Sequence, residues 1–208
     1  MGRFVLVHGA WHGRWCFERL AGELERRGHE TLVPELPCDE PGLTVHDYAA
    51  LVGPHPDAVV VGHSMGGLTV PFVPARMTVF LAGLVPVEGV YASFAHPEFG
   101  GTVRDELGRS YWPDLETTRL RLYPDLDPDD AAWAFARLRR QARVTPVTKL
   151  PDGPCASIVT TADRAVLPAW QERTAREALG IEPLFLDAGH SPFLTHVPEL
   201  ATLLESLA

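Results

Sequence analysis

Residues 58–68 read AVVVGHSMGGL, an apolar run that stops abruptly in a serine flanked by glycines. The consecutive valines have no helical spacing and predict a short strand buried on both faces, whereas residues 65–70 predict the start of a helix. Ser64 then lies at the turn between them, where Gly62 and Gly66 leave room for a sharp bend. The G-x-S-x-G pattern is typical of a nucleophile elbow, which lifts the serine hydroxyl above the sheet edge. A glycine-rich turn with a capping serine is the alternative interpretation.

Strands and helices alternate on either side of this stretch. Besides residues 58–61, we expect strands at residues 4–7, 30–34, 78–82, 155–161 and 183–187, and helices at 14–27, 44–51, 168–179 and 198–207. The helix after the serine is followed by Pro71 and Pro74 and should be short or kinked. Six strands that alternate with helices predict a mainly parallel, doubly wound α/β sheet in a single domain, residues 1–208.

The alternation is lost in residues 86–149, which are rich in aromatic side chains, proline and charge. We interpret about residues 86–149 as a short helical lid with an apolar underside, although most of its aromatic side chains should simply pack it onto the body. Asp127 and Pro128 predict the start of a helix that runs to about Gln141. Trp112 and Trp133 are candidate substrate contacts in this segment.

The composition is that of an ordinary globular protein, with 208 residues, 46% of them hydrophobic and 22% charged. Such a chain can bury a core without a metal or a disulfide. Cys16, Cys38 and Cys155 have no C-x-x-C spacing and predict free thiols in a reducing compartment. No run is long enough to cross a membrane and residues 1–7 are too short for a signal-peptide core, so we expect a cytoplasmic protein. The net charge of -9 argues against nucleic acid and anionic membranes as partners.

Three candidate catalytic residues follow three of the predicted strands, whose carboxyl ends meet at one crevice. Ser64 follows the third strand, Asp163 the fifth and His190 the sixth. A serine hydroxyl is a weak nucleophile, so it needs a histidine to take its proton and a carboxylate to orient that histidine. His190 is preferred because it stands on a short, glycine-marked loop after the last strand. Glu88, after the fourth strand, is the alternative acid.

The other requirement of acyl transfer is a pair of donors for the oxyanion. We predict the backbone N–H groups of Met65 and Ala10, the latter in the loop after the first strand. Gly9 lets that backbone approach closely. Gly9 and Trp11 are also candidate substrate contacts in the same loop.

Three further histidines, His8, His12 and His63, lie in the same loops as these candidates. They are more simply explained as anchors that bind backbone groups, although His12 is also a candidate substrate contact. His8 and His12 do not form a metal pair, because their loop is not helical and no third ligand is near. Ser191, next to His190, is another candidate substrate contact.

Four motifs together resemble the α/β-hydrolase superfamily: HGAWHGRW (8–15), GHSMGG (62–67), DRAVLPAWQ (163–171) and AGH (188–190). Within it they resemble the branch that contains plant methylesterases, hydroxynitrile lyases and their bacterial relatives, over nearly the whole chain apart from the lid. The resemblance implies an α/β-hydrolase fold and a Ser64, His190, Asp163 triad that needs neither metal nor cofactor. The lyases carry threonine and lysine where this chain has Gly9 and Ser191, which favours ester hydrolysis.

We therefore expect a serine esterase that cleaves a small apolar or aromatic carboxylic ester through an acyl-enzyme on Ser64. Its partner would be the small-molecule ester; the sequence indicates no oligomeric state. Two alternatives stay open. The protein could be a lyase, thioesterase or cyclase that acts on a biosynthetic intermediate, or a small-molecule receptor that retains the triad.

Overall fold

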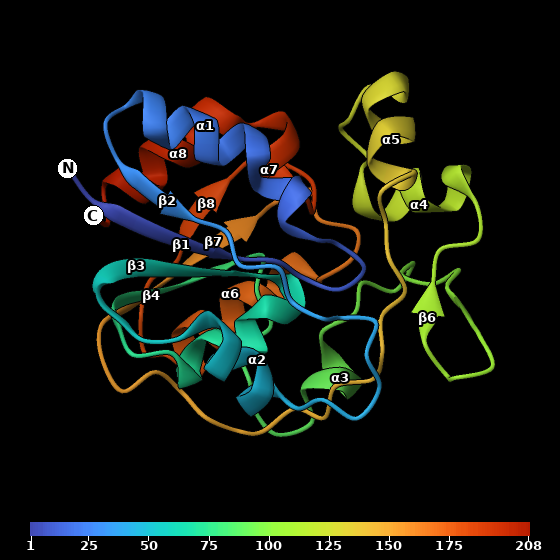
Figure 1. The fold of residues 1–208 in the computed structure, drawn as a ribbon, viewed down its shortest axis with the longest axis horizontal. Coiled ribbons are helices and arrows are strands. Elements are labelled where there is room, and N and C mark those ends of the chain that lie inside the picture. Colours follow the sequence, from blue (N-terminus) through green and yellow to red (C-terminus); the bar gives the residue numbers. More distant parts are fainter.

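The computed structural model describes residues 1–208, and at its centre is a six-stranded parallel sheet (Figure 1). The strands are β1 (Arg3–Val7), β2 (Glu30–Leu32), β3 (His55–His63), β4 (Ala75–Leu81), β7 (Cys155–Thr160) and β8 (Leu184–Leu186). Their order is β2-β1-β3-β4-β7-β8, and every neighbouring pair is parallel. The predicted doubly wound α/β sheet is confirmed, with all six strands parallel.

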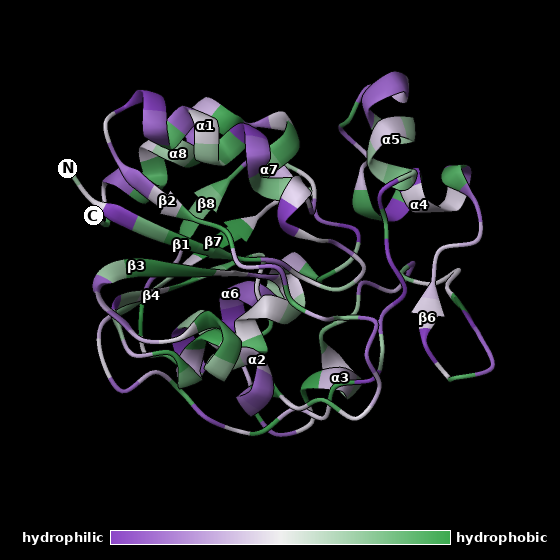
Figure 2. Ribbon diagram, viewed as in Figure 1, coloured by the Kyte–Doolittle hydropathy of each residue, from purple (hydrophilic) through white to green (hydrophobic).

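Helices cover both faces of the sheet. One face carries α1 (Glu18–Arg26) and α8 (Val197–Glu205), and the other carries α2 (Val45–Val52) and α6 (Pro168–Glu177) (Figure 1). Side chains of β1 alternate between these two layers, because successive residues of a strand point to opposite faces. Figure 2 shows a mainly hydrophobic sheet, whereas α1 and α2 carry both kinds of residue. The core is therefore divided into two layers, one on each side of the sheet.

Two helices differ from the sequence prediction. Two short 3₁₀ helices, Ser64–Leu68 and Val70–Phe72, stand where we expected a single helix to start. They are short as predicted, because Pro71 lacks an N–H and paired glycines disfavour helix. The helix predicted to reach Gln141 is α5 (Pro128–Phe135) and ends earlier. Tertiary contacts determine this end, since the N–H of Arg139 donates to the carbonyl of Trp11 at 2.7 Å.

Two other helical segments were also predicted imperfectly. The first turn of the helix predicted for residues 14–27 is a 3₁₀ helix, Arg14–Phe17, which precedes α1. A short helix, α7 (Pro192–Thr195), follows β8 and was not expected. None of the helices combines the length and apolar character that crossing a membrane requires.

The elements between β4 and β7 lie beyond the carboxyl ends of the strands, and the chain then runs back along the sheet to the start of β7 (Figure 1). These elements are α3 (Val90–Ser93), the hairpin of β5 (Val103–Arg104) and β6 (Ser110–Tyr111), α4 (Leu115–Leu122) and α5. Residues of α4 and α5 join the same hydrophobic cluster as α1 and α8. The interpretation of residues 86–149 as a lid on a single domain stays a prediction.

Candidate active site

Ser64 occupies a strained turn at the carboxyl end of β3. Its φ is +50°, in the left-handed region that side chains rarely adopt. A Cβ on Gly62 would lie 2.8 Å from the carbonyl oxygen of Gly66, and one on Gly66 would lie 2.6 Å from that of Val7. The carbonyl of Ser64 accepts a hydrogen bond from Leu84 N–H at 2.8 Å. Only glycine fits two positions before and two positions after this serine, as the elbow pattern predicts.

The loop after β1 lies directly against the serine. A Cβ on Gly9 would lie 2.8 Å from Ser64 Cβ, so glycine is needed for this close approach. The Ala10 N–H donates to no acceptor within the protein. Ala10 and Met65 both line the cavity that contains Ser64. The residues proposed to hold an oxyanion are thus next to the candidate nucleophile.

His190 and Asp163 form a buried pair beside Ser64. His190 Nδ1 lies 2.8 Å from Asp163 Oδ2, and each residue is only 2% exposed. Four other groups donate to the carboxylate, namely the N–H groups of Ala165 (2.7 Å) and Val166 (3.0 Å), Thr160 Oγ1 (3.0 Å) and Gln171 Nε2 (3.0 Å). With Nδ1 donating to Asp163, Nε2 is left to act as an acceptor. Ser64 Oγ makes no hydrogen bond with it in this structure, a contact that in unliganded enzymes often forms only with substrate.

The other three histidines of the site are anchors. Each binds a backbone carbonyl: His8 Nδ1 that of Gly9 (3.0 Å), His12 Nδ1 that of Ala10 (2.8 Å) and His63 Nε2 that of His190 (2.9 Å). Burial lowers the pKa of all three, to about 3 for His12, so they are neutral near pH 7. No group of three His, Cys, Asp or Glu side chains is gathered as metal ligands. These histidines hold loops in position instead of carrying protons.

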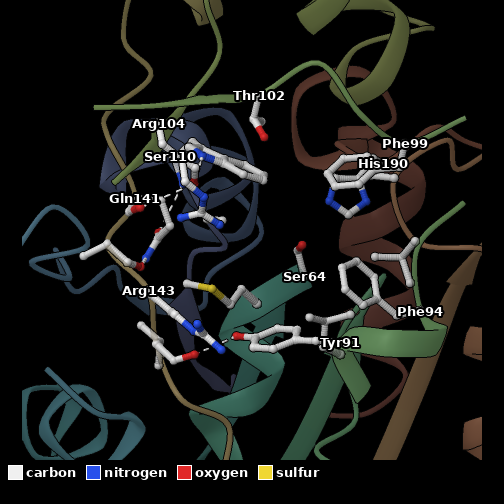
Figure 3. A pocket seen from close by; sticks show the side chains of 18 residues that line it. Ser64, Tyr91, Phe94, Phe99, Thr102, Arg104, Ser110, Gln141, Arg143 and His190 are labelled. Atoms are coloured by element: carbon white, nitrogen blue, oxygen red, sulfur yellow. Dashed lines mark hydrogen bonds between the residues drawn. The ribbon is translucent and has the colours of Figure 1, made fainter. Parts of the chain in front are cut away.

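A cavity of about 460 Å³ opens over Ser64 and His190 (Figure 3). Its apolar wall includes Tyr91, Phe94 and Phe99, all from the segment between β4 and β7. A volume of this size is suited to a small organic molecule.

Residues 4–203 match the model of the alpha/beta hydrolase family. The chain belongs to this family. Among solved structures, a pyrethroid hydrolase from Sphingobium faniae JZ-2 superposes with a TM-score of 0.80 at 20% identity, with 99% of this chain and 96% of that chain covered. This agreement shows that the fold is the α/β-hydrolase fold.

Two curated members of the family illustrate the similarity in sequence. Carbendazim hydrolyzing esterase of Nocardioides sp. (strain SG-4G) is 31% identical over 128 residues, which cover 55% of this chain and 51% of that protein. Methylesterase 3 of Arabidopsis thaliana is 30% identical over 152 residues, 63% of this chain and 55% of that protein. The chain spans about half the length of the curated relatives it matches. The predicted resemblance to plant methylesterases and bacterial relatives is confirmed.

In this α/β-hydrolase family member, only some of the predicted substrate contacts reach the cavity. Trp11 lines it, whereas Gly9, His12, Ser191, Trp112 and Trp133 do not. Gly9 faces Ser64, and His12 and Ser191 are each 1% exposed beneath the site.

The two predicted lid tryptophans pack against other aromatic rings outside the cavity wall. Trp112 lies 5.4 Å from Trp11, and Trp133 lies 5.3 Å from Trp15, both measured between ring centroids. They help to fix the segment between β4 and β7 onto the loop after β1 and the first turn that follows it. The alternative acid Glu88 is exposed and makes no hydrogen bond with His190.

Five polar residues of the cavity wall were not expected from the sequence. They are Thr102, Arg104, Ser110, Gln141 and Arg143. Gln141 Oε1 accepts the N–H of Trp11 at 3.3 Å, and Ser110 Oγ accepts from Trp11 Nε1 at 3.1 Å. No sequence motif identifies these residues, because their position depends on how the segment between β4 and β7 folds back over the loop after β1.

Proposed function

We propose that this α/β-hydrolase family member is a serine esterase that cleaves a small carboxylic ester through an acyl-enzyme on Ser64. The observation that carries the proposal is that His190, paired at 2.8 Å with the buried Asp163, lines the same cavity as a serine on a strained turn. A charged partner that fixes the tautomer of the histidine is what a serine nucleophile requires.

The proposed reaction has two halves. His190 Nε2 takes the proton of Ser64 Oγ as the oxygen attacks the ester carbonyl, and Asp163 stabilises the imidazolium. The backbone N–H groups of Met65 and Ala10 stabilise the oxyanion, each worth about 3 kcal/mol. His190 then gives the proton to the departing alcohol. In the second half water attacks the acyl-enzyme, His190 acts as base, and the carboxylic acid leaves.

The cavity supports an ester with an apolar or aromatic part. Tyr91, Phe94 and Phe99 offer ring faces for such a group. The names of the curated relatives include esterases and a methylesterase, in agreement with ester cleavage. The hydroxynitrile lyases of the branch that this chain resembles carry threonine and lysine at the positions of Gly9 and Ser191. These features favour hydrolysis over lyase chemistry.

Turnover of short p-nitrophenyl esters tests this function. We expect the wild type to release p-nitrophenol and Ser64→Ala to lower kcat by at least about a thousandfold. Ser206→Ala, a matched change at the end of α8, should behave as the wild type. An inactive wild type, or a fully active Ser64→Ala variant, would refute the proposal.

A further inference from the structure

Two arginines, Arg104 and Arg143, line the cavity above Ser64, and no acidic side chain does. This contrasts with the whole chain, which has 27 acidic residues and a net charge of -9. A wall with two permanent positive charges and no negative one is therefore a local reversal of the protein's overall charge. Such a reversal raises the local concentration of anions.

Neither arginine has a counter-ion in the protein. Other arginines of the chain form ion pairs, as Arg19 does with Asp130 at 2.6 Å. Arg104 and Arg143 have no carboxylate within 4.0 Å. Arg104 donates from one nitrogen to the carbonyl of Gly108 at 2.7 Å and keeps its other donors free. Both side chains are exposed to solvent at the cavity.

Two polar neighbours of the arginines, Tyr91 and Gln141, are neutral and hydrogen-bonded to backbone groups. Tyr91 OH donates to the carbonyl of Val144 at 3.1 Å, and burial raises the pKa of Tyr91 to about 12, so it supplies no negative charge for Arg143. Gln141 uses its amide oxygen for Trp11 N–H and its nitrogen for the carbonyl of Ala142 at 2.8 Å. The guanidinium groups are thus the charged donors of the wall that are left for a ligand.

The two arginines lie across the cavity from two of its aromatic rings, those of Phe94 and Phe99. In Figure 3, Arg104 and Arg143 lie on one side of Ser64, whereas His190, Phe94 and Phe99 lie on the other. A substrate with its ester at Ser64 can therefore extend one end toward charge and the other toward aromatic rings.

Resting on the proposed function, we propose that the substrate is an anionic ester, one that carries a carboxylate which Arg104 and Arg143 bind. Guanidinium groups match a carboxylate with paired, charge-assisted hydrogen bonds. A neutral apolar ester would leave both cations unpaired. Arg104 and Arg143 are thus residues that determine specificity and take no part in the bond-breaking steps.

Two aromatic esters that differ in charge test this inference. Anionic para-acetoxybenzoate and neutral para-acetoxybenzamide have the same shape, and the para position keeps the carboxylate from attacking its own ester. We expect the wild type to prefer the anion, after correction for the spontaneous hydrolysis of each ester. In the double variant Arg104→Gln/Arg143→Gln, the ratio of the two kcat/KM values should fall at least about tenfold. The matched surface change Arg173→Gln should leave this ratio unaltered.

Binding separates this inference from the proposed function, because it needs no turnover. Calorimetric titration with para-hydroxybenzoate and para-hydroxybenzamide should show tighter binding of the anion, with the preference reduced at least about tenfold in the double variant. The double Arg→Lys variant should retain part of it, since lysine keeps the charge but loses the paired geometry.

The outcomes are distinct. Ester turnover with an unchanged anion preference in the double variant would overturn the anionic-substrate inference and leave the esterase standing. Arginine-dependent binding of para-hydroxybenzoate without any ester turnover would support the anion site and refute the esterase. Equal binding of the two para-hydroxybenzoyl ligands by the wild type would overturn the inference by itself.

Discussion

Asp163 is the residue on which the choice of catalytic acid depends. Its carboxylate accepts hydrogen bonds from two backbone N–H groups, two side chains and His190, so both oxygens are held in fixed positions. Glu88, the alternative, is exposed and has no such support. An ionised group that is fully satisfied can orient a histidine without reorganising during the reaction.

Replacing this carboxylate by an amide tests its role. Asp163→Asn should lower kcat for a p-nitrophenyl ester by about 10⁴-fold, because an amide can hold the imidazole in the wrong tautomer and does not stabilise the imidazolium. Steady-state kinetics give the value. Glu88→Gln is the matched control and should keep wild-type kcat. A larger loss from Glu88→Gln than from Asp163→Asn would assign the acid to Glu88.

The sequence predicts the candidate catalytic residues better than it predicts the residues of the cavity wall. Ser64, Asp163 and His190 each follow a predicted strand, and glycines beside Ser64 and His190 mark loops that turn sharply. Arg104 and Arg143 come from the segment between β4 and β7, where no periodic pattern shows which way a side chain points. Long-range packing decides which residues face the cavity.

The loop after β1 is held by contacts on two sides. Gly9 lies against Ser64, and the next residues are tied to the lid segment: Trp11 accepts from the N–H of Arg139 at 2.7 Å and donates to Gln141 at 3.3 Å. Trp11 itself has a φ of +63°. These contacts fix the loop in position, as the proposed role of the Ala10 N–H in binding an oxyanion requires.

A methyl group at Gly9 should disturb this arrangement. In Gly9→Ala the new Cβ would lie 2.8 Å from Ser64 Cβ, so the loop or the serine must move. We expect kcat/KM for a p-nitrophenyl ester to fall about 100-fold, the cost of a displacement near 1 Å. The control is Gly22→Ala on α1, where a Cβ meets nothing within 4 Å.

Gly22→Ala should keep its activity and raise the free energy of unfolding by about 0.5–1 kcal/mol, because alanine favours a helix interior. Denaturant unfolding measures this gain. Wild-type kcat/KM in Gly9→Ala would contradict the close approach at Ser64.

The alternation of strands and helices in the sequence predicts the sheet, but it does not predict where every helix ends. Thr44 and Asp47 form a capping box at the start of α2, a local signal that the sequence carries. The end of α5 at Phe135 depends on contacts of the following residues with the loop after β1. Such contacts join residues that are far apart in the chain, so they produce no periodic pattern in the sequence.

The molecule as a whole contains a group of buried, neutral histidines near its centre. His8, His12 and His63 are at most 1% exposed. Desolvation lowers each pKa in the folded state, and His12 falls from 6.5 to about 3. The unfolded chain binds protons below pH 6.5 that the folded chain does not. Protonation of these histidines in the unfolded chain therefore has little effect on the free energy of unfolding above pH 6.5 and lowers it as the pH falls toward 3.

Urea unfolding at pH 7 and pH 5 tests this linkage. His12 alone should account for about 2 kcal/mol of the stability lost between these two conditions. His12→Gln removes the titrating group and should show a loss smaller by that amount. His46→Gln, at an exposed histidine, should lose as much as the wild type. Equal losses in all three proteins would contradict the neutral state of His12.

Labelling by a fluorophosphonate probe shows whether Ser64 is an activated nucleophile. The serine oxygen displaces fluoride from phosphorus only when a base such as His190 activates it. Mass spectrometry of the labelled protein should find a single modification, on Ser64, and none in Ser64→Ala. Modification of another residue, or a folded wild type that stays unlabelled, would contradict the account.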